Sequence, residues 1–251
     1  MKNIIYLAIT VILFLHMSVF AGTIDPYTPD SKYIEYGTKF HNVVPICGVY
    51  TNNSEFCASA VIIDPHHILT AAHVVKNSKR CLVTVGETKY CIVEIIAHKD
   101  FDDKHFGLND IAIGYCDRKM DMDFYPELYD QKDEVDKVCS ISGFGLTGTF
   151  KTGAIISDNK RRAGSNIIDR VEKHLLICSP SPGKYRRTEL EFLICSGDSG
   201  GGLFIDGKLA GINSCVLANG TTPPKSDYAT ESGHTRVSEH LDWIKQNLKK
   251  K

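Results

Sequence analysis

The stretch CSGDSGG at residues 195–201 is the most informative part of this sequence. It places Ser199 between an aspartate and two glycines, which suits an exposed serine on a tight turn. Glycine adopts positive φ and lets a substrate carbonyl approach the backbone. The same turn can direct the amides of Gly197 and Ser199 at one point, where they would stabilise an oxyanion. An ordinary loop rich in glycine and serine has the same local sequence, so the motif alone is a hypothesis.

The rest of the chain supplies the partners that a catalytic serine needs. A serine hydroxyl is a weak nucleophile, so it requires a base that is itself held by a third group. His73 ends the stretch ILTAAH at residues 68–73, and Asp110 lies within LNDIAI at residues 108–113. The order histidine, aspartate, serine differs from that of subtilisin and of the α/β-hydrolases. His73, Asp110 and Ser199 are therefore a candidate catalytic triad.

These motifs make the chain resemble the chymotrypsin/trypsin-like serine peptidases. The matching stretches are TAAH, NDIAI, ISGFG, GDSGG and the terminal TRVSEHLDWI, which follow one another in the family's order from residue 34 to the end. The resemblance implies an all-β fold of two six-stranded antiparallel β-barrels with a C-terminal α-helix. The first barrel would occupy residues 34–120, and the second, with the helix, residues 121–251. Together they would form one peptidase unit.

The residue pattern and the composition fit this expectation. Short β-rich runs separated by polar turns predict an all-β barrel or sandwich, and Val237, Leu241, Ile244 and Leu248 lie at the spacing of an amphipathic helix. The chain is 43% apolar and 24% charged, as in an ordinary globular protein. Its formal net charge of −1 gives no general affinity for nucleic acid or acidic lipid.

The first 21 residues predict a signal peptide. Lys2 precedes an apolar run at residues 4–20, and the small residue Ala21 follows as the expected cleavage point. An uncleaved membrane anchor is the alternative, but the run is barely long enough to span a bilayer and contains polar residues. The mature chain is therefore expected to be secreted, extracellular or periplasmic, with no membrane attachment after cleavage. Disulfides persist in such compartments.

Residues 22–33 are rich in Pro, Asp, Thr and Tyr without periodicity, which predicts a flexible lead or a propeptide. The resemblance implies that Ile34 becomes the apolar N-terminus of an activated zymogen, although only Ile34 and Gly37 match the family pattern there. In the family, the freed amine pairs with the aspartate before the nucleophile, here Asp198. A buried Asp198 needs some partner because an unpaired buried carboxylate is costly.

The chain has nine cysteines, so at least one is free or is paired outside the chain. Cys47 and Cys57 lie ten residues apart across a predicted hairpin, and so do Cys81 and Cys91. Each pair could therefore form a disulfide between neighbouring strands. Buried unpaired cysteines that pack as small apolar residues are the alternative.

The resemblance also implies the roles of the site residues. Ser199 attacks the scissile carbonyl, His73 takes its proton, and Asp110 holds the imidazole. The amides of Gly197 and Ser199 bind the oxyanion, and Ser214 supports Asp110. Such a peptidase needs no metal or organic cofactor, works as a monomer, and meets protein or peptide substrates and protein inhibitors. The alternative is a non-catalytic binding protein on a peptidase fold.

The resemblance further locates a specificity pocket. Trypsin-like relatives that cleave after Lys or Arg have an aspartate at its base, where this chain has Leu193. Val216 and Ser232 stand where deep pockets have glycine. A shallow apolar pocket that accepts small or medium apolar residues is therefore predicted, because a substrate cation would be left unpaired on Leu193. If Glu231 turned inward, it would restore a negative charge.

Overall fold

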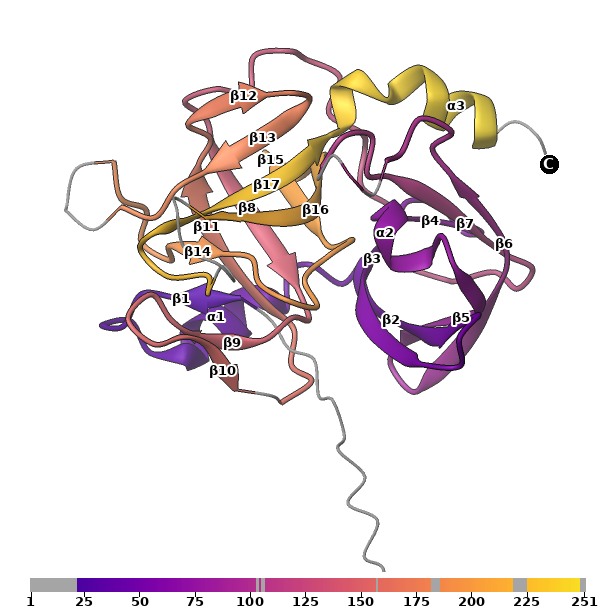
Figure 1. Ribbon diagram of the computed structural model, residues 1–251, viewed down its shortest axis with the longest axis horizontal. Coiled ribbons are helices and arrows are strands. Elements are labelled where there is room, and N and C mark those ends of the chain that lie inside the picture. The colour runs from indigo at the N-terminus through magenta and orange to yellow at the C-terminus, as the bar shows by residue number, and fades with distance from the viewer. Residues whose placement is uncertain are drawn as a thin grey trace, which may run out of the picture.

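The computed structural model describes residues 22–248 except 103, 105–106, 157, 182–185 and 219–224. The predicted signal peptide, residues 1–21, lies outside the described residues. The described chain forms two β-rich lobes side by side (Figure 1). None of the helices described here is long and apolar enough to cross a bilayer.

The first lobe is a closed antiparallel barrel with the strand order β2-β3-β4-β7-β6-β5. Its strands are β2 (Val43–Tyr50), β3 (Glu55–Ile62), β4 (His67–Thr70), β5 (Ser78–Val85), β6 (Thr88–Ala97) and β7 (Ala112–Cys116). The short helix α2 (Ala72–Val75) follows β4. Side chains such as Ile46, Val61 and Leu69 fill the barrel and are fully buried. All six strands fall inside the span that the resemblance assigns to the first barrel.

The second lobe contains a seven-stranded antiparallel sheet in the order β11-β8-β15-β16-β17-β13-β12. Its strands are β8 (Val138–Gly143), β11 (Arg162–Ile167), β12 (Arg170–Glu172), β13 (Leu175–Cys178), β15 (Gly202–Ile205), β16 (Lys208–Ala218) and β17 (Thr230–Arg236). The expected count was six. The additional strand is β12, three residues long, which pairs only with β13 at one edge of the sheet.

The described part of the chain ends in a helical segment, as predicted. A single 3₁₀ turn (Val237–Glu239) leads into α3 (Leu241–Leu248). Although α3 follows the second lobe in sequence, it reaches across to the first lobe (Figure 1). There the ring of Trp243 lies 5.1 Å from that of His98, and Ile244 is fully buried.

The prediction of a flexible lead at residues 22–33 is wrong. Strand β1 (Thr23–Ile24) runs parallel to β9 (Thr147–Thr149) and antiparallel to β14 (Phe192–Leu193), and β10 (Gly153–Ile156) completes a four-stranded sheet. Helix α1 (Asp30–Gly37) follows, and its Tyr33 is fully buried. The apolar residues of this segment are too few and irregular to show a period, but Ile24 and Tyr33 are buried, whereas Tyr27 is exposed.

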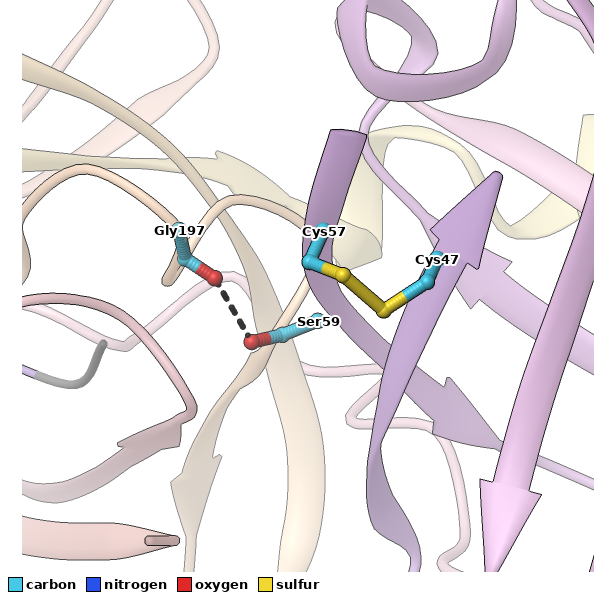
Figure 2. The surroundings of a disulfide bond; sticks show 4 residues. All are labelled: Cys47, Cys57, Ser59 and Gly197. Carbon is cyan, nitrogen blue, oxygen red and sulfur yellow. Dashed lines mark hydrogen bonds between the residues drawn. A yellow bond between two sulfur atoms is a disulfide. The ribbon is translucent and has the colours of Figure 1, made fainter. Parts of the chain in front are cut away.

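The cysteine predictions have opposite outcomes. Cys47 and Cys57 face each other on β2 and β3 and form a disulfide, which confirms the first pair (Figure 2). The second pair is wrong, because Cys91 lies opposite Leu82 rather than Cys81. This difference of one residue in the strand register puts Cys81 inside the barrel and leaves Cys91 exposed.

Candidate active site

The three residues of the candidate triad meet between the lobes in one chain of hydrogen bonds. His73 Nε2 lies 2.9 Å from Ser199 Oγ, and His73 Nδ1 lies 2.7 Å from Asp110 Oδ2. The backbone amide of His73 donates to Asp110 Oδ1 at 2.9 Å. The hydroxyl of Ser214 donates to Asp110 Oδ2 at 2.6 Å. Histidine thus contacts the serine with one ring nitrogen and the carboxylate with the other.

Each triad residue lies just outside the end of a strand. His73 is in the first turn of α2, directly after β4. Asp110 precedes β7, and Asn109 before it turns the chain with φ of 52°. Ser199 lies in the turn between β14 and β15. The first lobe therefore supplies the histidine and the aspartate, and the second lobe supplies the serine.

The environment of Asp110 keeps its carboxylate ionised. Burial acts to raise its pKa, since the residue is only 2% exposed. The hydrogen bonds and charge of His73, with the hydroxyl of Ser214, outweigh burial and hold the pKa below its usual range. An ionised Asp110 fixes the imidazole with a proton on Nδ1, which leaves Nε2 free to accept the serine proton.

The turn around Ser199 has the backbone form that the glycines predict. Gly197 and Gly200 have φ of 90° and 84°. A Cβ at Gly200 would lie 2.1 Å from both Ser59 O and Thr70 Oγ1, so no larger residue fits there. The turn is thus pressed against the first lobe at the strand that leads to His73.

Asp198 is fully buried, and its partner is not Ile34. Its Oδ2 accepts hydrogen bonds from the amides of Cys195 at 2.9 Å and Gly22 at 2.8 Å, and its Oδ1 accepts one from Gly145 at 2.8 Å. Burial outweighs these amides and raises the pKa of Asp198 to about 6. Ile34 is instead in the middle of α1, where the helix fixes the backbone on both sides.

The three residues of the predicted specificity pocket lie on adjacent segments. Val216 of β16 faces Ser232 of β17, and the Ser232 hydroxyl accepts a hydrogen bond from the amide of Ile194 at 2.9 Å. Ile194 directly follows Leu193, which is 1% exposed. The structure therefore places Val216 and Ser232 beside the segment that carries Leu193.

The carboxylate of Glu231 is hydrogen-bonded to residues outside the predicted specificity pocket. Arg170 donates two hydrogen bonds to its carboxylate, at 2.9 and 2.8 Å, and the Ser179 hydroxyl donates another at 2.9 Å. The bonds from Arg170 lower the pKa of Glu231 below its usual value. With its charge already paired, Glu231 is a poor candidate for binding a substrate cation.

Two contacts of this site were not anticipated from the sequence. Gly22 bonds to Asp198, and the signal that could have indicated it is its position directly after the expected cleavage point. Ser59 bonds to the turn that carries Ser199. It stands in a β-rich run with no catalytic pattern, so nothing in the sequence distinguishes it. Among the described residues, no group of three or more His, Cys, Asp or Glu is placed to hold a metal ion.

Comparisons with known proteins identify similar sequences. The family model described as Trypsin matches residues 38–244. Mast cell protease 3 of Ovis aries is 26% identical over 79% of this chain and 80% of its own. The chymotrypsin of Phaedon cochleariae is 28% identical over 73% of this chain and 69% of its own.

Solved structures show the same fold. HL collagenase superposes with a TM-score of 0.70 at 21% identity, covering 84% of this chain and 95% of the other. An inactivated protease paralogue of the scabies mite superposes with a TM-score of 0.62 at 17% identity, over the same shares of both chains. At sequence identities of 21% and 17%, these superpositions establish the fold of the chain and not its function.

Proposed function

This chain belongs to the trypsin family of serine proteases, and we propose that it is a secreted endopeptidase that cleaves peptide bonds through an acyl-enzyme on Ser199. The observation that carries the proposal is the unbroken chain of hydrogen bonds from Ser199 through His73 to Asp110. Family membership alone is not enough, because the fold also occurs in an inactivated paralogue.

The steps of the proposed reaction are those that the family resemblance implies for these residues. His73 Nε2 accepts the proton of Ser199 as Oγ attacks the scissile carbonyl, and then gives that proton to the leaving amine. Asp110 stabilises the imidazolium that forms between these steps. The amides of Gly197 and Ser199 stabilise the oxyanion of the tetrahedral intermediate. Water then attacks the acyl-enzyme, with His73 again acting as the base.

A fluorophosphonate probe tests this function directly. Such probes phosphonylate an activated serine, so we expect one adduct per chain, located on Ser199 by peptide mapping. Prior denaturation should abolish labelling, because the activation depends on His73. A folded protein that hydrolyses no peptide and takes up no probe would instead support the non-catalytic binding protein.

We also propose that the pocket formed by Leu193, Val216 and Ser232 selects small or medium apolar residues before the scissile bond. A substrate Lys or Arg would be buried against Leu193 without a counter-charge, which costs several kcal/mol. In a positional-scanning peptide library, we expect Ala, Val or Leu to exceed Arg and Lys by about 10²-fold in kcat/KM. Replacing Glu231 by Gln should leave that ratio unchanged. A dominant Arg or Lys that disappears in Glu231→Gln would contradict the assignment of the pocket.

Maturation is the third part of the proposal. Removal of residues 1–21 would make Gly22 the N-terminus and turn its nitrogen from an amide into an ammonium group. That nitrogen already lies 2.8 Å from Asp198 Oδ2. The new charge would pair with a buried carboxylate whose other partners are the amides of Cys195 and Gly145 and the Cys195 thiol. Cleavage of the leader would then be the activating step, with no propeptide at residues 22–33.

A further inference from the structure

Ser59 belongs to strand β3 of the first lobe, but it donates two hydrogen bonds to the catalytic turn, residues 195–201 of the second lobe. Its hydroxyl donates to the carbonyl oxygen of Gly197 at 2.9 Å (Figure 2). Its backbone amide donates to the carbonyl oxygen of Ser199, also at 2.9 Å. One buried residue therefore holds the carbonyls of the two residues whose amides form the proposed oxyanion hole.

The remaining polar groups of Ser59 join the catalytic turn to two other segments. Its Oγ accepts a hydrogen bond from the amide of Phe144 at 2.9 Å, and its carbonyl accepts one from the Thr70 hydroxyl at 2.8 Å. Thr70 ends β4, three residues before His73. Every polar group of Ser59 has a partner, as a rigid buried polar residue requires.

The strand that carries Ser59 is itself anchored. Cys57, two residues earlier on β3, is linked by the disulfide to Cys47 on β2 (Figure 2). On the other side of the contact, Gly200 lies so close to the carbonyl of Ser59 that it has no room for a Cβ. The catalytic turn therefore rests on a fixed surface of the first lobe, and the Ser59 hydroxyl is the side-chain contact by which that surface holds Gly197.

We propose that Ser59 is a positioning residue, which fixes Gly197 so that the oxyanion-hole amides point at the reacting carbonyl before substrate binds. The inference rests on the proposed function of Gly197 and Ser199. Preorganised donors accelerate a reaction because they need not reorient as charge develops on the oxygen. Loss of the Ser59 hydroxyl should therefore weaken binding of the transition state and leave binding of the substrate unchanged.

Replacing Ser59 by alanine is expected to lower kcat about tenfold with KM within twofold of wild type, the effect of one lost hydrogen bond of about 1.4 kcal/mol. A peptide boronate, which places a tetrahedral oxygen in the same hole, should bind about tenfold more weakly. A peptide product, which has no such oxygen, should bind as it does to wild type. If Ser59→Ala fails to fold, Ser59→Gly is measured instead, because it leaves room for water at the Phe144 amide.

Ser142→Ala is the matched control. Ser142 is also a fully buried serine whose hydroxyl donates to one backbone carbonyl, that of Arg162 at 3.0 Å, which lies outside the turn that carries Ser199. Its loss should lower the thermal midpoint, as the loss of a buried hydrogen bond does, and leave kcat unchanged. Equal kcat in wild type and Ser59→Ala, or an equal loss in Ser142→Ala, would overturn the inference. An inactive wild type would instead reject the proposed function.

Discussion

Replacing Ser199 by alanine is expected to reduce kcat for peptide hydrolysis about 10⁶-fold while the protein still folds. The alanine removes the hydroxyl that contacts His73 Nε2 and that would form the acyl bond. It keeps the backbone carbonyl that accepts the hydrogen bond from Ser59. The loss should therefore appear in kcat, with little change in the thermal midpoint.

Two companion variants make this result specific. His73→Ala should cause a similar loss, and adding it to Ser199→Ala should cause almost no further loss, because the two residues act as a unit. Ser196→Ala is the matched control, since it removes an exposed hydroxyl from the same turn. It should keep kcat within about threefold of wild type. Retention of a tenth of the wild-type activity by Ser199→Ala would contradict the assignment of the nucleophile.

The features predicted well from the sequence are those that chemistry restricts to a few residues. A triad needs His, Asp and Ser with particular flanks, so three short motifs were enough to select the residues that meet in the structure. The Cys47–Cys57 disulfide was predicted because both residues lie opposite each other across a short hairpin. The Cys81 and Cys91 pair had the same spacing but a turn that shifts the register, and spacing alone does not determine which face of a strand a residue occupies.

The features that were missed depend on contacts between segments far apart in the chain. Ser59 and Gly197 are 138 residues apart, and nothing near Ser59 indicates the turn against which it packs. Strand β1 has two residues and pairs in opposite directions with two separate segments, which gives no periodic pattern. Helix α1 has few apolar residues, and its position depends on burial of Tyr33 and on the ion pairs of Asp30 with the buried Arg162.

The largest effect expected at the N-terminus comes from adding one residue to it. A chain that begins at Gly22 has an ammonium group beside Asp198, whereas a chain that begins at Ala21 has a neutral amide there. With backbone amides and the Cys195 thiol as its partners, burial raises the pKa of Asp198 from 3.8 to about 6, a cost of about 3 kcal/mol for the ionised form. We expect the chain that begins at Ala21 to be about 10²-fold less active at pH 8. The free-energy cost of burying ionised Asp198 disfavours the ordered conformation of the catalytic turn, so fewer molecules are active.

The pH dependence of stability separates the two chains, both measured as Ser199→Ala proteins to prevent self-cleavage. In the longer chain, the folded state binds more protons than the unfolded state between pH 3.8 and about 6, because its Asp198 has the higher pKa. The free energy of unfolding should therefore be highest below this window and should fall as the pH rises through it. In the chain that begins at Gly22, the ammonium group removes this fall.

Replacement of Asp198 by asparagine should then have opposite signs in the two chains. In the longer chain it removes a buried charge that lacks a cationic partner, so the protein becomes more stable at pH 8. In the chain that begins at Gly22 it leaves a buried ammonium group unpaired, so the protein becomes less stable. Glu35→Gln, at an exposed site on α1, should have the same small effect in both. Equal activity of the two chains, with the same sign for Asp198→Asn, would show that the amine at Gly22 has no part in maturation.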